Sequence, residues 1–164
     1  MFDAALLARA EKLLADARAK GLKIVTAESC TGGLIAGLLT EIPGSSDVVE
    51  RGFVTYSNDS KHDLLDVPDD LIQRHGAVSA EVARAMALGA LKHARADLSV
   101  AVTGIAGPGG GTDTKPVGLV YLAAARGERV IARECRFGDI GRTGIRLKTV
   151  ATALEMLDAL LQPL

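Results

Sequence analysis

Apolar and polar positions along the chain follow two periods, one typical of amphipathic helices and one of buried strands. Over residues 2–17 the apolar positions recur every three or four residues, which predicts a helix that Gly21 ends. The same period over residues 145–161 predicts a long helix that closes the chain. Ser79 is a suitable N-cap for another helix, whose inner face runs from Val82 to His93.

Short apolar runs rich in β-branched residues lie between the helical segments and predict about five strands. The predicted strands are residues 22–27, 52–57, 97–103, 117–124 and 129–137. Only residues 125–128 separate the last two, a hairpin-length gap, so we expect these strands to be antiparallel neighbours. Further helices are expected over residues 34–42, over residues 61–65 and from Pro68, which suits a first helical turn.

Helices interleaved with short apolar strands are the pattern of an α/β protein. We therefore expect a three-layer α/β/α sandwich around a mixed, mainly parallel sheet of about five strands. The 164 residues contain no internal repeat, linker or low-complexity segment. We expect a single domain that spans residues 1–164.

Composition argues against several classes of function. The 19 basic and 20 acidic residues leave a net charge of −1, and the aromatic residues are 3 Phe, 2 Tyr and no Trp, so no nucleic-acid-binding surface is expected. No apolar stretch approaches the roughly 20 residues that span a bilayer, and the N-terminus lacks the order of a signal peptide. We expect no membrane segment and a cytoplasmic location. Cys30 and Cys135 lie in no CxxC motif and are expected to be reduced thiols.

Glycine is the residue in excess. Eleven of the 18 glycines fall within residues 32–37, 104–111 and 138–144. Such clusters indicate places where the backbone turns sharply or approaches a ligand closely. For the cluster at 138–144 we expect a turn rather than a ligand contact.

Three loops end predicted strands, at residues 28–33, 57–61 and 104–111. Ligands of α/β sheets bind at the carboxyl ends of strands, so these loops are the candidate site. The loop at 104–111 lacks both the GxGxxG spacing and the GK[ST] ending of known phosphate loops. Its glycines allow backbone amides to face an anion, and a mobile surface loop is the alternative.

The first loop places small polar residues at the start of a helix. Ser29, Cys30 and Thr31 there offer a hydroxyl or thiol beside a positive helix end, which suits an oxyanion, a phosphate or a nucleophile. The alternative is that Ser29 or Thr31 only caps the helix. We interpret Cys30 as a small packed residue, because no histidine partner is placed for it.

Lys61 follows the second predicted strand, and Tyr56 lies near the end of that strand. A lysine activates a serine only if burial or a nearby cation lowers the pKa of its amine towards neutrality. Ser29 and Lys61 can meet if the first two strands are parallel neighbours, and a solvated surface lysine is the alternative.

Two arginines and the three histidines are the candidates for binding an anion or a metal. Arg142 and Arg146 lie four apart on the last helix, where they are either a phosphate clamp or a solvated pair. The three histidines have no spacing that resembles a metal site, so we expect none. These patterns predict an α/β domain with an anion-binding pocket and a serine nucleophile, and they name no substrate.

Several longer motifs, in series from about Leu6 to Leu161, resemble the CinA C-terminal domain family. They are TAESCTGG at 26–33, GSS at 44–46, ERGFVTYSN at 50–58 with Lys61 following, HGAVS at 75–79, TGIAGPGGGT at 103–112 and KPVG at 115–118. The resemblance implies an α/β/α sandwich and a nicotinamide-nucleotide amidase. Such an enzyme hydrolyses nicotinamide mononucleotide to nicotinic acid mononucleotide and ammonia, with no metal or other cofactor.

The resemblance also implies roles for residues. Ser29 attacks the carboxamide, and Lys61 and Tyr56 act as base and proton relay. Substrate contacts are implied for the following residues: Glu28, Cys30, Thr31, Gly32, Gly33, Thr103, Gly104, Arg142 and Arg146. One segment departs from the family pattern, because the usual GDR before the last helix is here Gly138-Asp139-Ile140-Gly141-Arg142.

The family habit implies a homodimer or higher homo-oligomer whose partner is otherwise a small nucleotide substrate. The alternative function is a non-catalytic nucleotide-binding module that regulates another protein. A role in DNA uptake or damage response is suggested only by the historical family name. The charge of −1 and the scarce aromatic residues weigh against direct contact with nucleic acid.

Overall fold

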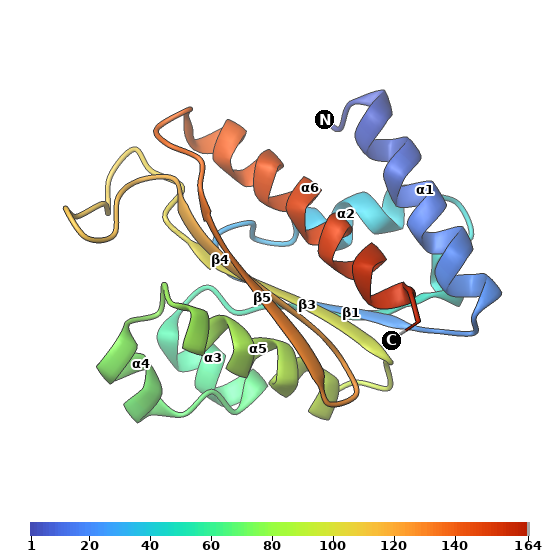
Figure 1. Ribbon diagram of the computed structural model, residues 1–164, viewed down its shortest axis with the longest axis horizontal. Helices are drawn as coiled ribbons and strands as arrows, with labels where there is room; N and C mark the ends of the chain where they lie inside the picture. Colours follow the sequence, from blue (N-terminus) through green and yellow to red (C-terminus); the bar gives the residue numbers. More distant parts are fainter. Residues whose placement is uncertain (164) are drawn as a thin grey trace.

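The computed structural model describes residues 1–163 and forms three layers around one sheet (Figure 1). The helices are α1 (Ala4–Ala19), α2 (Leu34–Glu41), α3 (Asn58–Leu65), α4 (Asp69–His75), α5 (Ala80–Lys92) and α6 (Arg142–Leu161), with a 3₁₀ turn η1 at Ser45–Asp47. The strands are β1 (Ile24–Glu28), β2 (Val49–Val54), β3 (Leu98–Gly104), β4 (Leu119–Arg126) and β5 (Arg129–Arg136). Figure 1 shows α1, α2 and α6 over one face of the sheet and α3, α4 and α5 over the other.

The strand order is β2-β1-β3-β4-β5. The pairs β1/β2 and β1/β3 are parallel, whereas β3/β4 and β4/β5 are antiparallel. The predicted sandwich and mixed sheet are therefore confirmed, with β4 running against the other four strands. The expected hairpin of the last two strands is also confirmed, and Gly127 turns it at a φ of +57°.

The second strand was placed three residues too late in the sequence. It begins at Val49, which pairs with Ile24, and it ends at Val54 rather than at Ser57. The pairing of β1 with β2 stops there because β1 ends at Glu28. The Glu28 carbonyl accepts the last hydrogen bond between the two segments, from the Thr55 amide at 2.8 Å. Tyr56 therefore lies in the connection to α3 and not on the strand.

The core is divided by the sheet. Larger side chains such as Leu98 and Val100 face α1, α2 and α6, while small ones such as Ala101 and Ala123 face α5. Small residues allow α5 to pack close to the sheet and to α3. A Cβ on Gly89 of α5 would lie only 1.9 Å from the Leu65 carbonyl oxygen at the end of α3. This close contact holds the end of α3 against α5.

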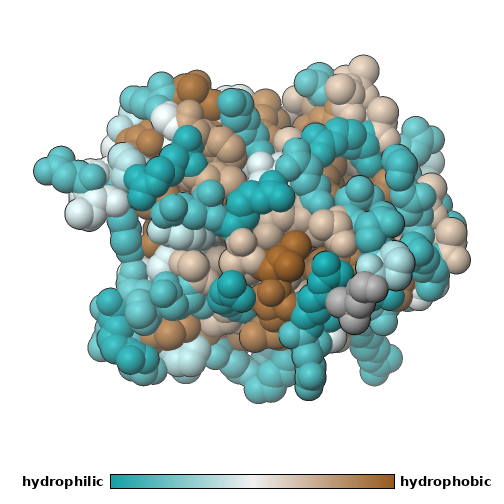
Figure 2. Space-filling model, in the orientation of Figure 1, coloured by the Kyte–Doolittle hydropathy of each residue, from teal (hydrophilic) through white to brown (hydrophobic). Residues whose placement is uncertain are grey.

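The surface carries mostly hydrophilic residues, with apolar residues in small groups between them on the face that Figure 2 shows. Within residues 1–163, no helix is long and apolar enough to cross a membrane. The third glycine cluster forms a turn only in part. Gly138 and Gly141 adopt positive φ before α6, whereas Gly144 lies inside that helix.

Candidate active site

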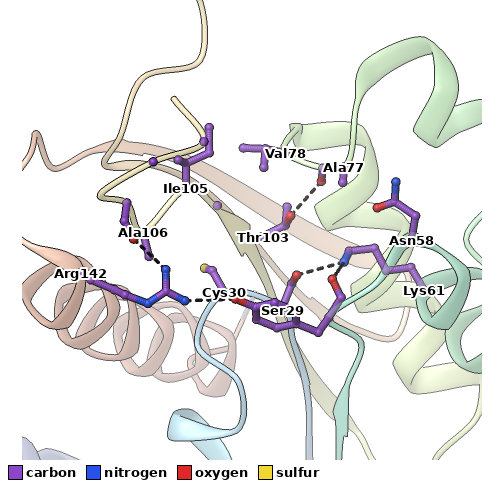
Figure 3. Close-up of a pocket in the computed structure, with 15 residues that line it drawn as sticks. Ser29, Cys30, Asn58, Lys61, Ala77, Val78, Thr103, Ile105, Ala106 and Arg142 are labelled. Carbon is purple, nitrogen blue, oxygen red and sulfur yellow. Dashed lines mark hydrogen bonds between the residues drawn. The ribbon is translucent and has the colours of Figure 1, made fainter. Parts of the chain in front are cut away.

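The three loops predicted from the sequence meet at the carboxyl ends of β1, β2 and β3. They enclose a cavity of about 290 Å³ at this edge of the sheet. The residues that line it are Ser29, Cys30, Tyr56, Asn58, Lys61, Ala77, Val78, Thr103, Gly104, Ile105, Ala106, Gly107, Gly109, Gly110 and Arg142. Figure 3 shows Lys61 and Arg142 reaching this cavity from opposite sides, with Ser29 between them.

Ser29 and Lys61, 32 residues apart in sequence, form a direct contact. The Lys61 Nζ lies 3.0 Å from the Ser29 Oγ, and the lysine is only 1% exposed. The Thr55 and Tyr56 carbonyl oxygens lie 2.7 Å and 3.4 Å from the same nitrogen. A neutral amine can donate to both carbonyls and accept the serine proton on its lone pair, so the geometry suits a base beside a nucleophile.

Burial changes the ionisation of Lys61. It lowers the pKa of this amine to about 8, because the ammonium loses its hydration in the protein interior. At pH 7 about a tenth of the molecules then carry the neutral amine, whereas an exposed lysine is almost entirely charged. The site therefore holds a usable base near neutral pH.

The lowered pKa predicts a signature in stability. Between pH 8 and 10.5 the native state binds fewer protons at Lys61 than the unfolded state, so this group makes the free energy of unfolding rise with pH. We expect the difference in unfolding free energy, wild type minus Lys61→Met, to grow by about 3 kcal/mol across this range. Urea denaturation of both proteins at pH 7, 8, 9 and 10.5 measures it. A constant difference would contradict the desolvation of Lys61.

Glu28 has a different place from the one implied by the resemblance. It is fully buried beneath Ser29 and contributes nothing to the cavity lining. Its carboxylate accepts hydrogen bonds from the Thr31 hydroxyl at 2.6 Å and from two amides of the first turn of α2, at Ile35 (2.9 Å) and Ala36 (3.1 Å). The positive end of α2 is thus occupied by a carboxylate of the chain itself.

This arrangement revises both interpretations of the first loop. Neither Ser29 nor Thr31 caps α2, whose N-cap is Gly33 in a left-handed conformation without a side-chain bond. The helix end is likewise not free to bind a phosphate or an oxyanion, because Glu28 already holds its amides. Thr31, Gly32 and Gly33 lie outside the cavity lining and shape the turn that presents Ser29.

Loss of the Glu28 carboxylate is expected to destabilise the fold. Glu28→Ala leaves a buried amide, a half-buried amide and a buried hydroxyl without their acceptor, and we expect a loss of about 3 kcal/mol in unfolding free energy. Glu28→Gln keeps one acceptor oxygen and is expected to lose less. Urea denaturation checks both values. Glu41→Gln, an exposed change at the other end of α2, is the control and is expected to alter stability little.

Cys30 is a buried thiol beside the nucleophile. Burial raises the pKa of this thiol to about 11, so it remains protonated at neutral pH. The raised pKa fits a packed residue and opposes a role as nucleophile. Both cysteines are free.

The two arginines of α6 have separate partners and do not form a clamp. Arg146 donates from Nε to the Cys30 carbonyl and from Nη2 to the Thr31 carbonyl, both at 3.0 Å. It therefore holds the nucleophile loop from below. Arg142 lines the cavity and donates to the Gly107 carbonyl at 2.7 Å and to the Tyr56 phenol oxygen at 3.1 Å.

The glycine-rich segment after β3 forms the wall opposite Ser29. Thr103 and Gly104, which the resemblance implied, line the cavity, and the Thr103 hydroxyl also donates to the Ala77 carbonyl at 2.8 Å. Lys115 donates to the His75 carbonyl at 2.6 Å. These bonds join the glycine-rich wall to the connection between α4 and α5. The wall is thus held in place at both ends.

Asn58 and residues 105–107, 109 and 110 line the cavity and were predicted only as parts of the candidate loops at 57–61 and 104–111. Ala77 and Val78 also line it and were not predicted as site residues. The available signal was position within the quoted motifs, since Asn58 ends ERGFVTYSN and Ala77 and Val78 lie in HGAVS. Within residues 1–163, no group of three or more His, Cys, Asp or Glu side chains is arranged to hold a metal ion.

Comparisons with known proteins point in one direction. The sequence profile of the CinA C-terminal domain matches residues 7–161. The nicotinamide-nucleotide amidohydrolase PncC of Escherichia coli strain K12 is 48% identical over 159 residues, which cover 96% of this chain and 95% of that protein. The putative competence-damage inducible protein of Caldicellulosiruptor bescii is 52% identical over 139 residues, 84% of this chain, and this chain spans only 33% of its length.

Solved structures are similar over nearly the whole chain. The competence/damage inducible protein CihA from Agrobacterium tumefaciens has a TM-score of 0.97 and 58% identity, covering 99% of both chains. The CinA superfamily protein KP700603 from Klebsiella pneumoniae 700603 has a TM-score of 0.90 and 30% identity, covering 95% of this chain and 97% of that one.

Proposed function

Because this chain belongs to the CinA C-terminal domain family, we propose that it is a nicotinamide-nucleotide amidohydrolase with Ser29 as its nucleophile. It hydrolyses the carboxamide of nicotinamide mononucleotide and releases nicotinic acid mononucleotide and ammonia. The observation that carries the proposal is the 3.0 Å contact between the Ser29 Oγ and the Nζ of a lysine that is only 1% exposed.

The first half of the reaction forms an acyl-enzyme. The neutral Lys61 amine takes the proton from the Ser29 hydroxyl as the Oγ attacks the carboxamide carbon. The C–N bond then breaks, and the Lys61 ammonium returns that proton to the departing nitrogen, which leaves as ammonia. In the second half, a water gives a proton to Lys61 and attacks the ester, and the Ser29 oxygen recovers the proton as the acid product leaves.

Lys61 carries the proton directly in this scheme. Its Nζ contacts the carbonyl of Tyr56, whereas the phenol oxygen of Tyr56 accepts from Arg142. Among the described residues, no hydrogen bond joins the phenol to the lysine, so a relay through Tyr56 is not needed. The oxyanion forms in the space between Ser29 and the wall at 104–107, which lines the cavity on its other side.

The charge of the cavity fits an anionic substrate. Lys61 and Arg142 are the charged residues among those that line it within the described chain, and both are cationic. Lys61 is occupied beside Ser29, so Arg142 is the group for the substrate phosphate. Its guanidinium has five N–H donors, of which the Gly107 and Tyr56 contacts use two.

The test is ammonia release from nicotinamide mononucleotide by the purified protein, with product identified as the mononucleotide acid. We expect turnover without added metal or cofactor. Saturable binding of the mononucleotide in calorimetry without any release of ammonia would instead support a nucleotide-binding regulatory module. If the mononucleotide neither binds nor is hydrolysed, both functions are excluded.

The pH dependence of the reaction follows from the ionisation of Lys61. Because the base is the neutral amine and its pKa is about 8, we expect kcat/KM to rise roughly tenfold per pH unit below pH 8 and to level off above it. Initial rates at low substrate between pH 6.5 and 9.5 measure this profile. A profile that is flat over that range would contradict Lys61 as the base.

A further inference from the structure

Tyr56 lies between Lys61 and Arg142, the two cationic residues of the cavity. Its backbone carbonyl is 3.4 Å from the Lys61 Nζ, and its phenol oxygen is 3.1 Å from the Arg142 Nη2. The residue is 60% exposed although it lines the cavity. The side chain of Tyr56 therefore extends from the Lys61 side of the cavity to the Arg142 side. Arg142 holds the hydroxyl end of the ring.

The substrate of the proposed function has the same order of parts. Its carboxamide is attached to a flat pyridinium ring, and the ring nitrogen carries the ribose phosphate. With the carboxamide at Ser29 and the phosphate at Arg142, the ring must cross the space beside Tyr56. The positive charge of the pyridinium is delocalised over that ring, so the ring needs an electron-rich partner.

The cavity offers few such partners. Of the lining residues within the described chain, none is a carboxylate, and Tyr56 alone is aromatic. An aromatic face attracts a cation and stacks on a flat ring. A residue whose hydroxyl is already bonded to Arg142 presents this face in a fixed orientation.

We propose that the aromatic face of Tyr56 is the binding surface for the cationic pyridinium ring, and that its hydroxyl serves to orient the ring rather than to carry a proton. This inference rests on the proposed function for the identity of the ligand. It makes Tyr56 a residue of substrate binding and specificity, which is a different role from the relay that the resemblance implied.

Kinetics of two substitutions separate the roles. Tyr56→Leu removes the aromatic face, and we expect KM for nicotinamide mononucleotide to rise about tenfold while kcat falls much less. Tyr56→Phe keeps the face and loses the bond to Arg142, and we expect an increase in KM of about threefold or less. A proton relay would give a different pattern, because Tyr56→Phe and Tyr56→Leu both remove the hydroxyl and both would then lower kcat by a large factor.

The composition of the chain allows a direct readout of binding. It has no Trp and only 2 Tyr, and Tyr121 lies outside the cavity with its hydroxyl bonded to Glu134 at 2.6 Å. In the double variant Ser29→Ala, Tyr121→Phe, all tyrosine emission comes from Tyr56 and no substrate is consumed. Tyr121→Phe by itself is the control for activity and is expected to match wild type.

Pyridinium rings accept electrons and quench the fluorescence of an aromatic ring that they touch. We expect nicotinamide mononucleotide to quench most of the Tyr56 emission saturably in this double variant. Ribose 5-phosphate, which has the phosphate without the ring, is expected to compete with it and to quench little by itself.

The outcomes distinguish this inference from the proposed function. Wild-type KM in Tyr56→Leu, or saturable binding without quenching, would overturn the role of Tyr56 while leaving the amidase intact. Absence of ammonia release by wild type would overturn the amidase, and the quenching experiment would still decide whether Tyr56 contacts the pyridinium.

Discussion

Replacing Ser29 with alanine is expected to lower kcat for ammonia release by about 10⁴-fold or more, because the reaction loses the oxygen that attacks the carboxamide. Substitution of the nucleophile in other serine hydrolases has effects of this size. The substrate contacts with Arg142 and the glycine-rich wall remain, so the change is expected in kcat with little effect on the affinity for the mononucleotide. Ammonia release and calorimetric binding together measure the two effects.

A second serine-to-alanine variant controls for the loss of a hydroxyl away from the cavity. Ser46→Ala removes an exposed serine hydroxyl in η1, away from the cavity, and is expected to retain wild-type activity. Lys61 keeps its two carbonyl partners in Ser29→Ala, so we expect this variant to fold. Thermal unfolding verifies that it does. Retention of more than a small fraction of the activity by folded Ser29→Ala would exclude Ser29 as the nucleophile.

Replacing Lys61 with methionine is expected to lower kcat by about 10³-fold, because the serine then has no base and the departing nitrogen has no acid. Methionine fills the buried space of the lysine stem without its charge, so the loss is not expected to come from unfolding. The measurement is the rate of ammonia release at saturating substrate at pH 8.

Arginine at this position separates charge from proton transfer. Lys61→Arg keeps a cation, yet a guanidinium does not lose its proton in proteins, so we expect it to be as inactive as Lys61→Met. Lys20→Met, an exposed change at the end of α1, is the matched control with full activity expected. Substantial activity in Lys61→Arg would mean that Lys61 contributes charge rather than a base.

The hydrophobic pattern predicted the architecture of the fold. Periods of about 3.6 and 2 residues report which side chains face the core, so the helices, the five strands and the final hairpin could be read from it. The error at β2 arose because residues 53–56 form an unbroken run of β-branched and aromatic residues, whereas Glu50, Arg51 and Gly52 interrupt residues 49–54. The actual ends of β2 depend on where its neighbour β1 begins and stops. A strand boundary set by a partner strand is not a local property of the sequence.

The candidate site, too, was predicted in part from the sequence and decided in part by tertiary contacts. Loop position and chemistry made Ser29 and Lys61 candidates, the resemblance implied their roles, and the parallel pairing of β1 with β2 brings them together. No local pattern indicated that the Glu28 carboxylate turns back onto α2, which changes a predicted anion site into an occupied helix end. Arg142 and Arg146 share a helix at the spacing of one turn, yet one faces the cavity and the other binds carbonyls beneath it.

By itself the sequence determined the layers of this protein, the loops in which its chemistry lies and the family that it resembles, because these depend on the order and type of residues. Only the tertiary structure decided which groups touch and which are ionised. The pKa of Lys61 falls to about 8 through burial under elements that are distant in sequence, and the orientation of Tyr56 depends on an arginine 86 residues away. Such properties arise from the environment of a side chain, which exists only once the chain has folded.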